Sequence, residues 1–461
     1  MVGVSEKSGL ALLRAVHALR GRRELWLFVV VFGVFAVTAG RAHLCFDVWT
    51  SNYASWRLAT AHTPYIDGVS IPELDNNTIK WVWIQDAPNG HTVVTRAPAA
   101  VLAGLPAYLI SQPDHMTVIP AALTAAALTA TAVVLFHRAV RTVLVPWQAL
   151  AAAAAFAFTT PVWSVSANGI WPQTITVLGI AIVAWAVTVD RWWSVGLAGI
   201  LLLWARPHAA VIVAVVGLAA AWRARSIGIA LRAGLPGLLS LPLLCLWTQW
   251  IYGSWSPMPL FGSGAFSQVQ QSLFDPVNQA AMWVAPDRGL FVFTPVLLVL
   301  LPTVVRTWRQ LPRWSTDLLV AGLVYTLVQA AIIGYSGGYP IYGYRYGLEF
   351  LACAAPAYAF AAARSVGWAR RSLPAVLSLQ FTVILLGAVV DRVTLWDTDG
   401  WTDNAFVHAL VHGGPAAPVM AAAVWGTSFL LVRMWTRAQL AAPAPAETSL
   451  AAELSPARSE G

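Results

Sequence analysis

Long apolar stretches separated by short polar turns dominate the pattern of this chain. An apolar window of roughly 17–25 residues matches the length of a helix that crosses a lipid bilayer. The pattern predicts such helices at about twelve places, over residues 24–43, 117–137, 147–161, 173–189, 193–206, 207–222, 233–251, 289–305, 315–335, 346–363, 373–392 and 415–434. We therefore expect an all-α polytopic membrane protein, a bundle of about twelve transmembrane helices.

One apolar stretch, residues 97–111, requires a separate interpretation. It is short and contains Pro98 and Pro106. Counting it as a span would place most of the arginine-rich loops outside, whereas Lys and Arg in short loops favour the cytoplasmic side. We interpret 97–111 as an interfacial or re-entrant helix that does not cross.

The charges support this topology. With a cytoplasmic N-terminus, 20 of the 28 Lys and Arg residues fall inside, but only 7 of the 20 Asp and Glu residues do. The chain then divides into a basic cytoplasmic segment 1–23, a membrane domain 24–435 and a cytoplasmic tail 436–461. The Ala/Pro/Ser/Glu-rich composition of this tail predicts disorder.

The large polar segments all fall on the outer side. They are the loops 44–116, 252–288, 336–345 and 393–414, and we expect them to carry short interfacial helices. The inner loops are short and basic. We therefore expect function, and any active site, on the extracytoplasmic face.

Composition narrows the class of protein further. The chain is 58% hydrophobic and 10% charged, with a mean hydropathy of +0.66, which excludes an ordinary soluble domain. The net charge of +8 records membrane topology rather than nucleic-acid binding. The three cysteines are scattered and form no CxxC pair, so neither a disulfide framework nor a zinc site is expected. Many Ala, Arg and Trp residues with few Lys are typical of a high-GC bacterium, so we expect a bacterial plasma membrane.

Asp47 is the first candidate for chemistry, because it heads the largest polar loop just beyond the first predicted span. A carboxylate there can act as a general base on a hydroxyl acceptor. Its apolar neighbours Phe46, Val48 and Trp49 are expected to desolvate it and to raise its basicity. The alternative is an ordinary interfacial aspartate among the other outer acids.

Three outer arginines are candidates for binding a phosphate. Arg206, in WARPH, and Arg345, in YGYRYGLEF, lie at predicted span ends, and Arg288 lies in APDRGLF. Arginine binds phosphate through paired hydrogen bonds and stays charged at low dielectric constant. Ionisable groups at this depth are functional candidates. The alternatives are snorkelling to the interface and, for Arg288, a local pair with Asp287.

Other polar patterns are weaker. The loop SGGYPIYGYR combines glycines that permit a tight backbone with tyrosines that suit either sugar stacking or the membrane interface. The acidic segment 396–404 lacks the spacing of a calcium loop. The first-loop histidines His43, His62, His91 and His115 lack metal-ligand spacing. We therefore predict no cofactor, and a divalent metal has no support in the pattern.

Four stretches, taken in order, resemble the GT-C superfamily of membrane glycosyltransferases, in particular the bacterial branch related to protein mannosyltransferases and aminoarabinose transferases. FDVWTSNYASWRLATAHTPYIDG resembles the first outer loop of that family, and HTVVTRAPAAVLAGLPAYLI resembles its return to the membrane. WTQWIYGSWSPMPLFGSG with VAPDRGLFVFTPVLLVLLP resembles the second large outer loop, and YSGGYPIYGYRYGLEFLACAAP resembles a glycine-rich loop with an embedded arginine.

The resemblance implies a GT-C-like bundle whose outer loops form a cleft, with a polyprenyl-phosphate sugar as donor and a glycan or glycolipid as acceptor. Asp47 matches the catalytic base, and Arg345, with Arg206 or Arg288, would stabilise the departing lipid phosphate. The expected substrate-binding residues are Trp49, His91, Tyr342, Tyr344 and Glu349. A single carboxylate facing a phosphate leaving group suits inversion of the anomeric carbon. Val48 follows Asp47 where many relatives carry Glu, which weakens a metal-dependent variant.

The donor is suggested only by analogy. In a mycolate-type envelope, decaprenyl-phosphate mannose or arabinofuranose would be natural donors, which implies a mannosyltransferase or arabinofuranosyltransferase of cell wall biosynthesis. The alternatives are a multi-spanning transporter or flippase of lipid-linked sugars and a non-catalytic scaffold. Transporters tend to carry internal repeats, and none is visible here. The pattern does not predict an oligomeric state.

Overall fold

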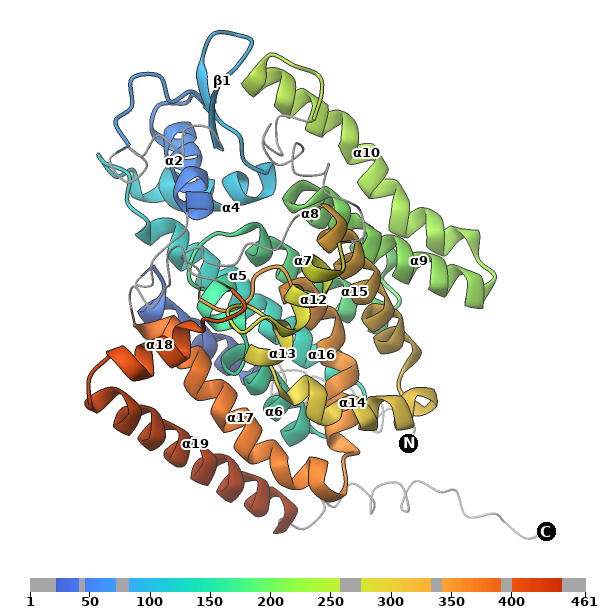
Figure 1. Ribbon diagram of the computed structural model, residues 1–461. Helices are drawn as coiled ribbons and strands as arrows, with labels where there is room; N and C mark the ends of the chain where they lie inside the picture. Colours follow the sequence, from blue (N-terminus) through green and yellow to red (C-terminus); the bar gives the residue numbers. More distant parts are fainter. Residues whose placement is uncertain are drawn as a thin grey trace, which may run out of the picture.

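The computed structural model of the protein describes residues 22–40, 46–71, 83–257, 275–332, 342–390 and 400–441. Within these residues the chain is helical apart from one small hairpin (Figure 1). The first helix covers residues 22–38. The later α-helices are α2 (Phe46–Thr60), α4 (Pro98–Ser111), α5 (Ile119–Val140), α6 (Pro146–Phe158), α7 (Pro172–Thr188), α8 (Trp192–Ala205), α9 (Ala210–Ala224), α10 (Ile227–Tyr252), α12 (Pro276–Val284), α13 (Leu290–Phe293), α14 (Val296–Thr307), α15 (Arg313–Ile332), α16 (Leu348–Ala363), α17 (Gly367–Val389), α18 (Ala405–His412) and α19 (Ala416–Ala441).

The fold is that of a multi-pass membrane protein. Among the described residues, six helical segments are long and apolar enough to cross a bilayer, namely Ile119–Val140, Pro207–Ala224, Ile227–Tyr252, Arg313–Ile332, Gly367–Val389 and Ala416–Arg437. Each of the twelve predicted segments overlaps a helix, but several of these helices are shorter than a span, among them α6, α7, α8 and α16. Twelve crossings therefore stay a prediction.

The segment predicted as one span over 289–305 is interrupted. The short helix α13 ends at Phe293, and α14 begins at Val296. Pro295 lies between them and has no N–H to continue the helical hydrogen bonds. The break lets Gln380 of α17 accept a hydrogen bond from the Val296 N–H at 2.8 Å.

The stretch 97–111 forms the helix α4, which starts with Pro98 at its first position. It packs along α2, and Gly104 makes this approach possible. A Cβ on Gly104 would lie 2.8 Å from the Ser55 Oγ of α2. Ser55 is buried there and donates to the Val101 carbonyl at 2.8 Å. Whether α4 is interfacial or re-entrant stays a prediction.

The part of the first outer loop between α2 and α4 forms a hairpin that the sequence pattern did not predict. Strand β1 (Ile84–Asp86) pairs antiparallel with β2 (Thr92–Val94), with Gln85 opposite Val93. Figure 1 shows α2, β1 and α4 together at one end of the molecule. The hairpin, α2 and α4 thus form a compact cap over that end of the bundle.

Small side chains dominate the helix-to-helix core. Helices α5, α7 and α8 pack side by side, as do α15 and α16, around buried alanines such as Ala126, Ala184 and Ala354. Short side chains let apolar helices approach closely in a membrane. At the other edge, α19 lies against α17 and α18. Helices α7, α8 and α16, which contribute to the site, pack within this core.

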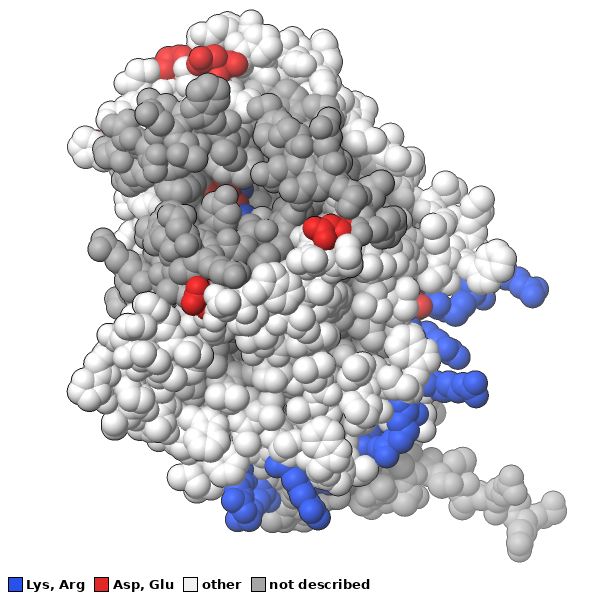
Figure 2. Space-filling model, in the orientation of Figure 1, with Lys and Arg blue, Asp and Glu red and all other residues white. Residues whose placement is uncertain are grey.

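Charge is distributed unevenly over the surface. In Figure 2 most visible Lys and Arg side chains lie along the lower and right-hand edges, and most visible Asp and Glu side chains lie above them. Two ion pairs join helices, Arg138 of α5 with Glu24 of the first helix and Arg223 of α9 with Asp317 of α15. The predicted tail 436–461 falls mostly outside the described residues, and α19 extends to Ala441.

Candidate functional site

Asp47 occupies the first turn of α2, where the positive end of the helix dipole favours a carboxylate. Its side chain is only 10% exposed. Ser51, one turn further along, donates to the Asp47 carbonyl at 2.8 Å. The packing of α2 on α4 thus holds a charged group away from water, which is costly unless the charge is paired.

Two arginines, distant in the sequence, pair with Asp47. Arg345 Nη1 donates to Asp47 Oδ2, and Arg96 Nη1 lies 3.4 Å from Asp47 Oδ1. Arg345 belongs to the turn before α16, and Arg96 to the segment between β2 and α4. The fold therefore brings together the predicted base, one predicted phosphate ligand and an arginine that was not in the predicted site.

The electrostatics of Asp47 differ from the expectation of raised basicity. Burial raises the pKa of the Asp47 carboxyl, but the charges of Arg96 and Arg345 lower it, and the net shift is downward from its ordinary value. The expectation from apolar neighbours omitted these two cations, because nothing near Asp47 in the sequence reveals them. In this state Asp47 is a firmly ionised carboxylate rather than a strong base.

Arg96 is held by a serine of α2 and by a tryptophan next to strand β1. Its Nε lies 3.4 Å from the Ser51 Oγ, and its guanidinium carbon lies 4.3 Å from the ring centroid of Trp83. A guanidinium over an indole face is attracted by the ring quadrupole. Arg96 is 5% exposed, so α2 and the hairpin hold it in place.

Arg345 lies on the opposite wall. Its Nη2 donates to the Tyr346 hydroxyl at 2.7 Å, and its guanidinium carbon lies 4.7 Å from the Tyr346 ring centroid and 5.5 Å from that of Trp171. Gln173 donates to the Arg345 carbonyl at 3.5 Å. Arg345 thus reaches from the turn before α16, beside the first turn of α7, across to Asp47 on α2.

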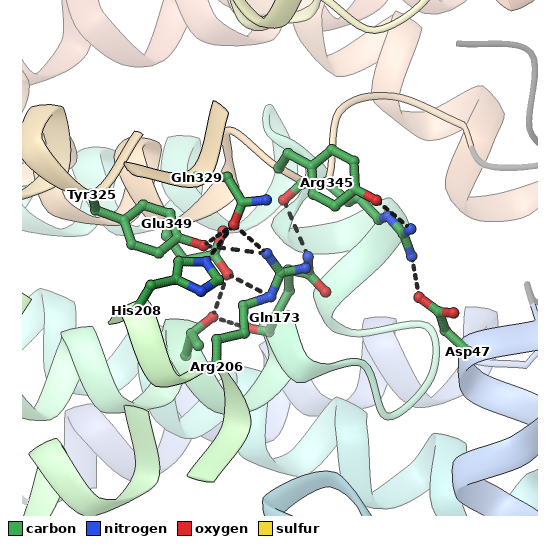
Figure 3. A network of polar contacts seen from close by, with 10 residues as sticks. Asp47, Gln173, Arg206, His208, Tyr325, Gln329, Arg345 and Glu349 are labelled. Carbon is green, nitrogen blue, oxygen red and sulfur yellow. Dashed lines mark hydrogen bonds and ion pairs between the residues drawn. The ribbon is translucent and has the colours of Figure 1, made fainter. Parts of the chain in front are cut away.

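A second buried cluster surrounds Arg206 (Figure 3). Arg206 follows the last residue of α8, and its Nε lies 3.6 Å from Glu349 Oε1. Its Nη1 donates to Gln329 Oε1 at 2.7 Å and to the Tyr325 hydroxyl at 3.3 Å. Glu349 is fully buried and also accepts from the Thr176 hydroxyl at 2.9 Å. A charge pair at this depth needs such additional hydrogen bonds.

The same cluster fixes the tautomer of a partly buried histidine. His208 Nε2 lies 2.5 Å from Gln329 Oε1, and its ring stacks on Tyr325 with centroids 5.2 Å apart. Gln329 must present its oxygen here, because Arg206 has only donors. His208 Nε2 therefore carries the proton that it donates to Gln329.

The two clusters meet at Tyr346. Its ring lies 4.7 Å from the guanidinium carbon of Arg345 and 5.5 Å from that of Arg206. Figure 3 shows the Gln173 carboxamide between the Arg206 cluster and Asp47. Gln173 Oε1 and the indole N–H of Trp171 are buried without a hydrogen-bond partner among the described residues. Unpaired buried polar atoms of this kind suit the hydroxyls of a ligand.

The local sequence explains how α7 presents these groups. A buried π-helical turn, Val162–Ser166, precedes α7. Thr174 donates to the Ser166 carbonyl at 2.8 Å and accepts from the Trp171 N–H at 3.1 Å, and Pro172 begins the helix. The first turn of α7 is thereby anchored with Gln173 beside Arg345.

The other predicted site residues contact groups outside the Asp47 and Arg206 clusters. Tyr342 is buried, donates to the Val383 carbonyl at 2.7 Å and fills the space that Gly387 leaves. Tyr344 is buried and shares a 2.6 Å hydrogen bond with Thr294. These tyrosines brace the start of α16. Trp49 is half-buried on α2 against the main core, and Arg288 pairs with Asp287 at 3.0 Å.

His91 lies on the hairpin, outside these clusters. Its ring stacks on Tyr65 at 3.8 Å between centroids, and its Nδ1 lies 2.8 Å from Asp67 Oδ2. The Thr92 N–H donates to Asp67 at 2.7 Å. These hydrogen bonds, the Thr92 backbone bond foremost, lower the pKa of Asp67. The group forms an exposed polar and aromatic patch beside α2.

Sequence reasoning missed several members of the site. Gln173 and Gln329 are lone amides within apolar runs, which is a signal that pattern reading can use. Arg96 directly precedes the apolar stretch of α4, and sequence reasoning gave it no role. Metal ligation has no basis among the described residues, since no group of three or more His, Cys, Asp or Glu gathers there. Of the acidic segment 396–404, residues 396–399 lie outside them and residues 400–404 are described.

Comparison with known proteins adds no assignment. No protein family, no curated protein and no solved structure is significantly similar to this chain. The site geometry is therefore the basis for any functional conclusion.

Proposed function

We propose that the protein is a membrane glycosyltransferase that moves a sugar from a polyprenyl-phosphate donor to a hydroxyl of a glycan or glycolipid acceptor. The observation that carries this proposal is the pairing of Asp47 with Arg345 in a buried polar layer between apolar helices. A carboxylate suits proton removal from a hydroxyl, and a guanidinium suits a phosphate leaving group.

The proposed reaction is a single displacement at the anomeric carbon. The acceptor oxygen forms a bond to that carbon while its proton passes to an Asp47 carboxylate oxygen. The bond between the anomeric carbon and the phosphate oxygen breaks, and the electron pair leaves with the lipid phosphate. Arg345 stabilises the negative charge that develops there. Glu349 pairs with Arg206 and is fully buried, so Asp47 is the base in this account.

Arg206 has a supporting part in this proposal. Its charge is already balanced by Glu349, and its Nη1 is engaged by Gln329 and Tyr325. It faces the Tyr346 ring on which Arg345 also lies. The Arg206 cluster therefore holds the wall that carries Arg345, and Arg345 is the phosphate ligand.

The surroundings of the site fit a lipid donor and a polar acceptor. In this proposal the polyprenyl chain remains in the bilayer beside the apolar helices while its phosphate reaches Arg345. The hairpin patch of Tyr65, Asp67 and His91 lies beside α2 and offers an aromatic face and a carboxylate to a glycan. The uneven surface charge (Figure 2) supports an extracytoplasmic site in a bacterial plasma membrane.

The experiment that tests this function uses the purified protein in proteoliposomes with a panel of polyprenyl-phosphate sugars, mannose and arabinofuranose first, and a glycan acceptor. The expected product is an acceptor heavier by one sugar residue, detected by mass spectrometry, together with free polyprenyl phosphate. Movement of intact donor between leaflets without a new glycosidic bond would contradict the proposal and identify a flippase.

A further inference from the structure

The contacts of Asp47 pose a mechanistic problem. A general base must offer a free oxygen to the acceptor hydroxyl. In the structure Arg345 occupies Oδ2 and Arg96 lies near Oδ1. A carboxylate held between two guanidinium groups is a poor proton acceptor, so one of these contacts has to change before the reaction.

The two arginines differ in how they are held. Arg96 belongs to the same wall as Asp47, since Ser51 of α2 and Trp83 beside β1 fix it. Arg345 comes from the opposite wall, and its other described partners are the Tyr346 hydroxyl and the faces of Tyr346 and Trp171. Arg345 is therefore the partner that can leave Asp47 without disturbing α2.

We propose that Arg345 changes partners during the reaction, moving from its contact with Asp47 to the lipid phosphate when the donor binds, while Arg96 stays beside Asp47 as a positioning residue. This inference rests on the proposed function. The phosphate offers more acceptor oxygens and charge than the carboxylate and takes a guanidinium in paired hydrogen bonds. Asp47 is released only when the sugar to be transferred is present.

The exchange gives Asp47 two states. While Arg345 is bound, the two arginine charges outweigh burial and hold the pKa of Asp47 low. When Arg345 moves to the phosphate, burial remains and one cation is neutralised, so Asp47 becomes more basic. Arg96 then keeps the carboxylate oriented. As long as Arg345 contacts Asp47, the carboxylate is therefore not an active base.

The test measures binding of sugar-free decaprenyl phosphate to the full-length protein in detergent, so that it does not depend on turnover. In the exchange, Asp47 competes with the phosphate for Arg345. Asp47→Asn should therefore tighten binding by about tenfold, and Arg345→Gln should weaken it. In the Arg345→Gln background, Asp47→Asn should have no effect. Asp317→Asn, which removes a carboxylate paired with Arg223, is the matched charge control and should leave binding unchanged.

Each outcome decides between accounts. If Asp47→Asn tightens binding equally with and without Arg345, the effect is plain charge repulsion and the exchange is wrong. If Asp47→Asn leaves binding unchanged while Arg345→Gln weakens it, the exchange is wrong but the proposed function stands. If the wild-type protein does not bind decaprenyl phosphate, both are wrong. Arg345→Lys keeps the charge without the paired hydrogen bonds and takes the place of Arg345→Gln if that variant folds poorly. The exchange then requires that Asp47→Asn tighten binding less in the Arg345→Lys background than in the wild type.

Discussion

At the residue scale, the chemistry of Asp47 depends on its ion pairs. Its nearest sequence neighbours are apolar and burial raises its pKa, yet the charges of Arg96 and Arg345 lower the pKa below its ordinary value. The fold brings these two arginines from 49 and 298 residues away. Such contacts are not visible in a sequence pattern. The sequence therefore identified Asp47 as a candidate base but could not predict that its pKa is lowered.

The pH dependence of the reaction follows from this pairing. The pKa of Asp47 is lowered in the free protein. The ion pairs of Asp47 therefore stabilise the folded site fully at pH values above the ordinary aspartate pKa of about 3.9. This stabilisation is lost as the pH falls through the lowered pKa and Asp47 becomes protonated. In the donor complex the pKa rises. The acid limb of kcat should therefore lie at higher pH than the acid limb of kcat/KM, measured with a polyprenyl-phosphate sugar. Coincident limbs would argue against the partner exchange.

The pair of Arg206 and Glu349 gives a separate prediction about stability. Removing one partner of a buried ion pair costs about 3–5 kcal/mol, because the other charge stays buried and unpaired. Arg206→Met should therefore lower the melting temperature in detergent strongly. Arg206→Met with Glu349→Gln should restore much of the loss. Equal melting temperatures for the single and double variants would show that Glu349 does not depend on Arg206.

At the element scale, apolar patterning located the helices well. Each predicted span overlaps a helix because runs of this length satisfy their backbone hydrogen bonds internally. The pattern missed the interruption at Pro295, the hairpin β1–β2 and the lengths of individual helices. These depend on packing partners. Of the site, Asp47, Arg206, Arg345 and Glu349 were predicted, whereas Arg96 and Gln173 were not, since their importance comes from distant contacts.

The contact between α2 and α4 tests the architecture of the cap. Gly104 lies so close to Ser55 that a Cβ would approach its Oγ to 2.8 Å. Gly104→Val should therefore push α4 away from α2, cost about 1–3 kcal/mol and reduce transfer, because α2 carries Asp47. Gly33→Val is the matched control, since nothing lies within 4 Å of its Cβ position. If Gly104→Val and Gly33→Val change the melting temperature and the turnover equally, the close contact between α2 and α4 does not position Asp47.

At the scale of the whole molecule, the protein combines an apolar helical bundle with a polar cap of α2, α4 and the hairpin. The buried polar layer lies where the two meet, with Asp47 from the cap and Arg345 from the bundle. In the proposed function, a lipid-linked donor and a polar acceptor approach this site from different sides. The position of the polar site between the apolar bundle and the cap therefore favours the proposed transferase over a scaffold.

The most direct test of the central claim is single-turnover sugar transfer by wild-type protein and by Asp47→Asn, with polyprenyl-phosphate sugar bound to both and product followed by mass. We predict that Asp47→Asn slows transfer by about 10²–10⁴-fold although the donor stays bound. Transfer by Asp47→Asn at the wild-type rate would contradict the assignment of Asp47 as the base.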